Sequence, residues 1–162
     1  MPAPVMTYSP FDVTVNIGDY VIPGVVRITI TWNEIPFRLV RGIRGVNTRV
    51  RSRDNSATLT LELLQTSIGN DVLYQILEQD IVFGSARLEL SVSDLSGGLR
   101  VFTDQAFVQK YPDVQLSNDL DNRVWEIGML NVKAPELGGN SKTATDYFQN
   151  ISQRISSLFS ED

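Results

Sequence analysis

Two residue types that carry much of enzyme chemistry are missing from this sequence: its 162 residues include no cysteine and no histidine. The absence of cysteine excludes a disulfide framework, a thiolate nucleophile and a thiolate zinc site. The absence of histidine excludes an imidazole metal ligand, a histidine general base and a Ser-His-Asp triad. We therefore expect a protein that is not an enzyme and that uses no metal or cofactor.

Long apolar runs are also missing. No stretch approaches the roughly 18–20 apolar residues that a membrane-spanning helix needs. The first twelve residues, MPAPVMTYSPFD, lack the basic and apolar regions of a secretion signal. With 42% hydrophobic and 20% charged residues, the composition is typical of an ordinary globular protein. We expect the chain to fold in a cytoplasm without inserting into a membrane.

Positive charge is scarce and concentrated in one place. The formal net charge is −5, and the isoelectric point is about 4.7. Residues 35–53 nevertheless contain no acid and six arginines, which are Arg38, Arg41, Arg44, Arg49, Arg51 and Arg53. One basic surface on an otherwise acidic protein suits self-association as well as binding to an anionic partner.

Apolar and polar residues alternate along most of the chain, which predicts strands with one wetted face. Thr and β-branched residues dominate these stretches, as a half-buried pleated surface prefers. Short strands at close spacing favour a mainly β protein, a sandwich or barrel, over βαβ units. The expected strands cover residues 11–17, 27–32, 58–63, 87–93, 99–103, 106–111 and 124–132.

Residues 67–81 follow a helical pattern instead. Ser67 or Asn70 can cap the helix, and Asp71 lies in the first turn, where the helix dipole favours an acid. An apolar stripe predicts that the helix packs on a flank of the sheets. The stripe consists of Val72, Leu73, Ile76 and Leu77.

Two segments have too little apolar content to form a core of their own. Residues 36–53, interrupted by Gly42 and Gly45, are expected to form a long hairpin or loop that projects from the body as an arm. Residues 135–162 are expected to be an extension to a domain of residues 1–134. This extension combines a Gly/Ser/Asn linker with an amphipathic helix that docks either on its own domain or on a neighbouring subunit. The helix's docking face consists of Phe148, Ile151, Ile155, Leu158 and Phe159.

The order of motifs resembles one known family over about residues 10–133. An F-D-V-T-V strand precedes the pattern V-x-S-x-D-x-S-x-x-x-T-L-x-L-L-Q-T-S-x-x-N-D-x-L, which runs from Val50 to Leu73. A D-x-S-G hairpin at 94–97, P-D-V at 112–114 and W-E at 125–126 follow. Together these motifs resemble the tail tube proteins of contractile-tailed bacteriophages, which are similar to the tube proteins of type VI secretion and of long non-contractile tails.

The resemblance implies a fold and a role. The fold would be two packed antiparallel sheets in a barrel-like sandwich flanked by a helix. Hexameric rings would close into an inner β-barrel and stack into a hollow tube, surrounded by a contractile sheath, through which genomic DNA is ejected. The partners would be further copies of the chain, the sheath protein, and baseplate and tail terminator proteins, in a virion tail assembled in the host cytoplasm.

Particular residues acquire expected roles under this resemblance. The six arginines of residues 38–53 would lie on an arm that reaches a neighbouring subunit or ring. The channel that passes DNA would be lined by polar residues on wetted strands, without binding the DNA specifically. Candidates for this lining are Thr58, Thr60, Glu62 and Glu89. An acidic and small polar lining would repel phosphate groups.

Three alternatives stay open at this point. The chain could be the tube subunit of a phage-tail-like injection device, such as a pyocin or a type VI-like system. It could bind nucleic acid through the Arg38–Arg53 arm, against which the negative net charge and scarce aromatic interleaving count. It could also be a glycan-acting enzyme with paired carboxylates among Asp119, Asp121 and Glu126, but no motif supports that.

Overall fold

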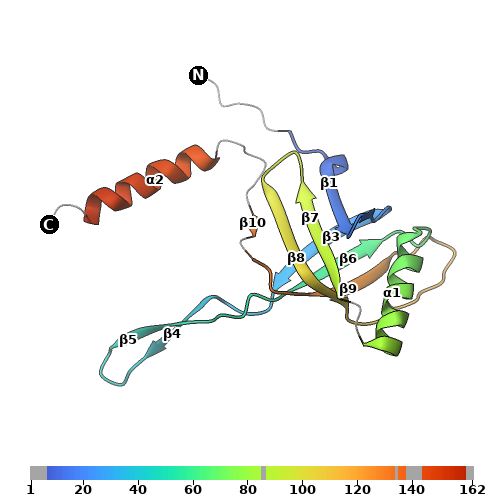
Figure 1. Ribbon diagram of the computed structural model, residues 1–162, viewed down its shortest axis with the longest axis horizontal. Helices are drawn as coiled ribbons and strands as arrows, with labels where there is room; N and C mark the ends of the chain where they lie inside the picture. Colours follow the sequence, from blue (N-terminus) through green and yellow to red (C-terminus); the bar gives the residue numbers. More distant parts are fainter. Residues whose placement is uncertain (1–6, 85–86, 134, 138–143, 160–162) are drawn as a thin grey trace.

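The computed structural model describes residues 7–84, 87–133, 135–137 and 144–159 (Figure 1). The protein is mainly β, as the alternation predicts. A short 3-10 turn, Pro10–Asp12, precedes the first strand. The strands are β1 Val13–Ile17, β2 Tyr20–Val21, β3 Val25–Trp32, β4 Phe37–Arg41, β5 Asn47–Arg51, β6 Ala57–Leu63, β7 Leu88–Asp94, β8 Leu99–Val108, β9 Arg123–Leu130 and β10 Glu136–Leu137. The helices are α1 Gly69–Phe83 and α2 Ala144–Phe159.

The strands form two antiparallel sheets. One has eight strands in the order β2-β1-β7-β8-β9-β6-β3, with β10 added on β8, and the other consists of β4 and β5 alone. The large sheet folds over, so that its β1–β7–β8 part crosses its β3–β6–β9 part (Figure 1). The result is sandwich-like, which confirms the expected fold class, without a closed barrel.

A bulge in β8 makes this bend possible. Leu90 pairs with Thr103 but Leu88 pairs with Ala106, so β8 carries one extra residue between the two pairs. The Thr103 hydroxyl donates to the carbonyl of Leu130 and accepts a bond from the amide of Gln105 at 3.2 Å. Bulges of this kind bend a strand. The two separate strands expected at 99–103 and 106–111 are therefore one strand, Leu99–Val108.

The core lies between the two parts of the folded sheet. Leu59, Leu61 and Leu63 on the inner face of β6 are completely buried. Trp125 on β9 and Val92 on β7 join the same cluster from the two layers. In β6, Thr58, Thr60 and Glu62 alternate with these leucines, so the outer face of this strand is polar.

The helix expected over residues 67–81 is observed as α1, Gly69–Phe83, with Leu73 and Leu77 buried against the core. It ends at Gly84, which has a φ of 65° and donates its N–H to the carbonyl of Asp80 at 2.7 Å. This left-handed conformation favours glycine. Of the described helices, none is both long and apolar enough to cross a membrane.

The start of α1 differs from the expected capping. Its N-cap residue is Ile68, and no side chain caps it. The Ser67 hydroxyl accepts a bond from the amide of Gly69 at 3.1 Å. The side-chain amide of Asn70 instead donates to the carbonyls of Leu64 and Ser67, at 2.8 and 3.2 Å, and its oxygen accepts a bond from the indole of Trp125 at 2.9 Å. Asn70 thus ties the turn before α1 to β9 because its short amide side chain both donates and accepts.

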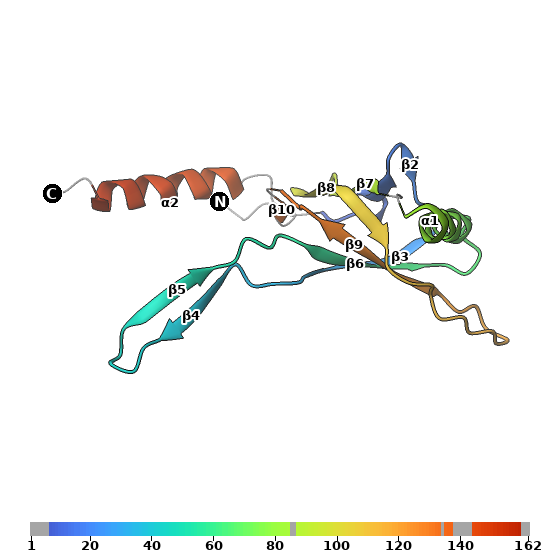
Figure 2. The same ribbon diagram turned by 60° about the horizontal axis from the view of Figure 1, so that its bottom comes forward.

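Two elements project from this body. The β4–β5 hairpin extends away from the large sheet on one side, while α1 and the 109–122 connection lie on the other (Figure 2). The helix α2 follows β10 and also leads away from the sheet in both views. The division into residues 1–134 and 135–162 stays a prediction.

Candidate self-assembly surfaces

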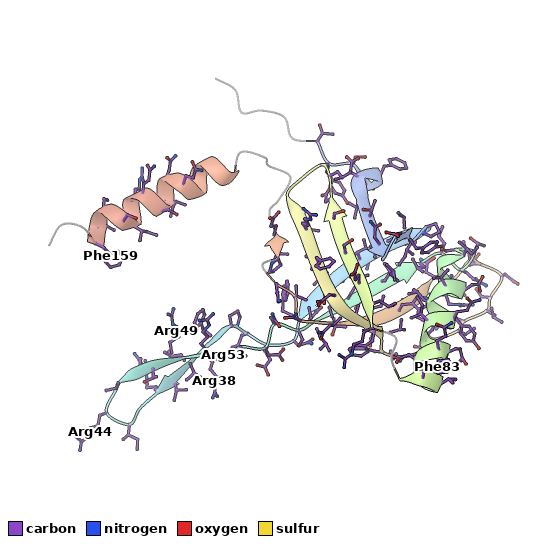
Figure 3. The ribbon with its side chains drawn as sticks, viewed as in Figure 1. Arg38, Arg44, Arg49, Arg53, Phe83 and Phe159 are labelled. Atoms are coloured by element: carbon purple, nitrogen blue, oxygen red, sulfur yellow. The ribbon has the colours of Figure 1, made fainter. Side chains whose placement is uncertain are left out.

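The arm, residues 36–53, contains a regular hairpin of β4 and β5. Phe37 pairs with Arg51, Leu39 with Arg49 and Arg41 with Asn47, so Arg41, Arg49 and Arg51 share one face. Arg38 lies on the other face. Arg44 lies in the turn at the far end of the arm (Figure 3), and Arg53 follows β5.

Hydrogen bonds and a ring contact order the arm without neutralising it. The Arg49 guanidinium lies 4.2 Å from the centre of the Phe37 ring, a cation–π contact. The Arg41 Nε donates to the Asn47 side chain at 3.2 Å. All six arginines are exposed, and among the described residues none of them forms an ion pair. Their charge is therefore available to a partner.

The S-x-D-x-S part of the sequence motif forms the base of the arm. The Ser52 hydroxyl donates to Glu34 at 2.7 Å, and the Asp54 carboxylate accepts the amide of Ser56 at 2.9 Å. That backbone hydrogen bond, with a second one from the Ser56 hydroxyl, holds the pKa of Asp54 below its usual value. The Asn33 amide donates to the Ser56 hydroxyl at 2.8 Å. Sequence reasoning did not assign a role to Asn33 or Glu34, and these bonds fix the direction of the arm.

Three of the four predicted channel residues share one surface. Thr58, Thr60 and Glu62 lie on the outer face of β6, which is flanked by β3 and β9. Cross-strand pairing extends this surface to further residues, namely Arg27, Thr29, Thr31, Val124, Glu126 and Gly128. We call the outer face of β3, β6 and β9 the threonine face.

The threonine face is closer to neutral than to acidic. The Arg27 Nε lies 4.0 Å from the Glu62 Oε2, and the Lys110 Nζ lies 3.7 Å from the Glu126 Oε1. Glu62 also accepts a hydrogen bond from the Asn122 amide at 2.9 Å. Exposed pairs of this kind add little stability. Their effect is to place a cation beside each of the two acids on this surface.

Glu89 does not join the threonine face. It is exposed on β7, in the other part of the folded sheet. Because both parts turn their inner faces to one core, their outer faces point in different directions. The structure therefore does not bring Glu89 together with Glu62 on one surface of the same copy.

Acidic residues gather at the end opposite the arm. Helix α1 and the 111–121 connection contain six acids and no lysine or arginine. These acids are Asp71, Glu78, Asp80, Asp113, Asp119 and Asp121. We call this region the acidic end. Figure 3 places Phe83, at the end of α1, and Arg44 at opposite extremes of the molecule.

Specific contacts hold the 111–121 connection against α1. The Tyr111 hydroxyl donates to Glu78, and the Tyr111 and Tyr74 rings lie 5.9 Å apart. The bond to Glu78 raises the pKa of Tyr111 to about 12, so the contact persists until strongly alkaline pH. Asp119 and Asp121 belong to a turn in which the Ser117 hydroxyl donates to Asp121 at 2.9 Å. That placement gives the paired-carboxylate enzyme no support.

Large apolar side chains accompany the charges at both ends. Ile43 at the tip of the arm is fully exposed, and Leu39 is 66% exposed. At the acidic end, Phe83 is 75% and Leu116 is 77% exposed. Exposed apolar side chains that cluster beside charged residues are typical of protein interaction sites.

The predicted docking face of α2 is exposed as far as it is described. Ile151, Ile155, Leu158 and Phe159 are 55%, 49%, 75% and 81% exposed. The side chain of Phe148 lies outside the described residues. The chain's own sheet therefore leaves this apolar stripe uncovered.

One sequence relative is informative. The chain is 35% identical over 105 residues to the structural protein ORF10 of Pseudomonas phage KPP10. This match covers 64% of the chain and 60% of the phage protein, so the chain spans less than two thirds of that relative's length. No protein-family model matches the chain.

Solved structures share the fold at low sequence identity. A chain in the structure of the anti-feeding prophage cap (AFP tube terminating cap) aligns with a TM-score of 0.59 at 14% identity, covering 82% of this chain and 93% of that chain. A chain of the PVC sheath/tube terminator aligns with a TM-score of 0.55 at 17% sequence identity. This alignment covers 80% of this chain and 97% of that chain. A chain of the PVC sheath-tube complex, an extracellular contractile injection system, aligns with a TM-score of 0.53 at 16% sequence identity. This alignment covers 80% of this chain and 89% of that chain. The chain thus has a fold found in contractile injection systems, and the proteins similar to it are structural components, not enzymes.

Proposed function

We propose that the chain is a structural subunit of a phage tail, specifically of the tail tube. Hexameric rings of the chain stack into a hollow conduit for genomic DNA, surrounded by a contractile sheath. The observation that carries the proposal is the division of the molecule into a basic arm and an acidic end at opposite extremes, on a fold found in sheath-tube assemblies.

The edge of the large sheet supports ring closure. Among the described strands, β3 pairs with β6 and with no strand on its other side. An unpaired edge of eight residues invites addition of another strand, and a closed barrel removes such edges. Pairing of β3 with a neighbouring copy would join the threonine faces into one continuous inner surface.

A neutral, threonine-rich inner surface fits passage of DNA. A basic lining would hold the phosphates through counterion release, and DNA would then move slowly. The cations beside Glu62 and Glu126 weaken the acidic repulsion expected from sequence. Small hydroxyl side chains and balanced charges still offer no basic groove. Thr58, Thr60 and Glu62 are the proposed lining, and Glu89 faces elsewhere.

Charge complementarity supports stacking. An arm with six arginines on one copy and six acids at the opposite end of the next would attract each other head to tail. The tail sheath would surround the tube, and baseplate and terminator proteins would meet its two ends, within a virion tail assembled in the host cytoplasm.

A ring that terminates a tube is the second candidate. The likeness to chains of a tube terminating cap and of a sheath/tube terminator favours it. A terminator would form rings that do not stack, whereas a tube subunit would form stacks. A tube of a pyocin-like or type VI-like injection device would stack in the same way and carry no genome.

Light scattering on the purified chain tests the proposal. We expect a discrete species of about six times the 18.1 kDa chain mass, and larger particles as concentration rises. A species that remains at one chain mass at all concentrations would contradict it. Tight DNA binding at physiological salt would instead favour the nucleic-acid-binding alternative.

A further inference from the structure

An open apolar groove of about 700 Å³ lies between the edge strand β3 and the layer of β1, β7 and β8. Its lining includes Val13, Ile28, Ile30, Val92 and Leu99. Ile28 and Ile30 lie on the core side of β3, yet both are only half-buried. The core is thus incompletely covered along this edge.

The helix α2 carries an exposed apolar stripe of the kind that docks in grooves. Its exposed residues Ile151, Ile155 and Leu158 follow the i, i+4, i+7 pattern of helices that dock in grooves. Sixteen helical residues span about 24 Å. The eight residues of β3 span roughly 26 Å, so the helix can lie along the full strand.

The tether of α2 starts at the rim of its own chain's groove, so a second copy that receives the helix must lie close to this rim. Leu137 lines the groove, and its strand β10 pairs with β8 at Leu99. Only residues 138–143 separate Leu137 from the start of α2, a reach of about 20 Å. The rim also holds Asp94, an acid that can face Arg154 beside the apolar stripe of α2.

We infer that α2 of one copy docks in the β3-edge groove of a second copy. Both surfaces are exposed in the same chain, and α2 leads away from its own sheet in both views. A helix and a groove at different places on one chain make a head-to-tail contact that repeats from copy to copy. This inference rests on the proposed function, because it specifies how neighbouring subunits are linked.

The absence of cysteine makes the inference directly testable. A chain with Ile28→Cys and a second chain with Ile155→Cys are mixed at equal concentration and mildly oxidised. The peptide pair joining positions 28 and 155, which in this mixture can form only between chains, is then quantified by mass spectrometry. We expect the yield of this peptide pair to be at least 10-fold higher than in mixtures where Thr29→Cys replaces Ile28→Cys or Gln153→Cys replaces Ile155→Cys. The reason is that the docked side chains are held within disulfide distance.

Two control variants match the positions. Thr29→Cys lies beside Ile28 on the outer face of β3, and Gln153→Cys lies on the polar side of α2. A chain carrying both Ile28→Cys and Ile155→Cys should give a ladder of covalently linked oligomers. A fast-migrating monomer alone would show docking within one chain and would overturn the inference, as would equal yields in all mixtures.

The outcome separates this inference from the proposed function. Light scattering could show rings or larger particles although the 28–155 cross-link does not form. That result would overturn the docking of α2 on a second copy and leave the tube proposal standing. Loss of both particles and cross-link would contradict both proposals. Changing Ile155→Asp, with Gln153→Asp as control, should raise the concentration needed for assembly about 10-fold through the lost apolar contact.

Discussion

Reversing the charge at three positions of the arm, with Arg41→Glu, Arg49→Glu and Arg51→Glu in one chain, is expected to weaken stacking strongly while leaving the fold intact. The three arginines share one exposed face and have no acidic partner within the described part of their own chain. In a stack, glutamates at these positions would meet the acidic end of the next copy, and like charges at an interface are unfavourable. We expect the concentration needed for stacking to rise by about 100-fold or more.

Two further variants make this prediction specific. Lysine at the same three positions keeps the charge and should preserve stacking with a moderate loss. Adding Asp113→Lys, Asp119→Lys and Asp121→Lys to the reversed arm should restore part of the assembly, since the three new lysines can then attract the three new glutamates. Particle size by light scattering at two salt concentrations is the measurement, because salt weakens exposed charge pairs. Normal stacking of the reversed arm would contradict the proposed role of the basic arm.

Replacing Asn70 with alanine is expected to lower the free energy of unfolding by about 2–3 kcal/mol. Asn70 makes hydrogen bonds to the carbonyls of Leu64 and Ser67 and accepts the indole N–H of Trp125. Trp125 is only 2% exposed, so removal of its partner leaves a buried donor unsatisfied. The loss should appear as a melting temperature lower by roughly 5–10 °C.

A double-mutant cycle checks the cause of that loss. Trp125→Phe removes the indole donor, so the effects of Asn70→Ala and Trp125→Phe should not add when the two are combined. Asn55→Ala, at an exposed position outside the helices and strands, should change stability by less than about 0.5 kcal/mol. Additive effects of the two core changes, or an Asn70→Ala protein as stable as the parent, would contradict the bridging role.

Much of the fold follows from local pattern. Strands β6 and β7 alternate cleanly because each has one core face and one wetted face, and this alternation is readable in the residues themselves. The bulge in β8 was not predictable in the same way. It depends on the Thr103 hydroxyl reaching the carbonyl of Leu130 on another strand, a contact that only the folded chain creates.

The candidate surfaces show the same limit. A basic stretch is visible in the sequence because its six arginines all lie within residues 38–53, where no acid occurs. The acidic end is assembled from α1 and the 111–121 connection, which are distant in sequence and meet through Tyr111 and Glu78. Ile28 and Ile30 read as ordinary core positions, because alternation does not distinguish a buried strand from an edge strand beside an open groove. Glu62 and Glu89 read alike as wetted acids, although the fold turns them to different sides.

Electron microscopy of the purified chain at high concentration tests the central claim most directly. The account predicts stacked rings that form hollow tubes, with β3 paired to the neighbouring copy and the threonine face, including Thr58, Thr60 and Glu62, lining the channel. Dispersed single chains, or tubes in which the outer face of β7 with Glu89 lines the channel, would contradict it.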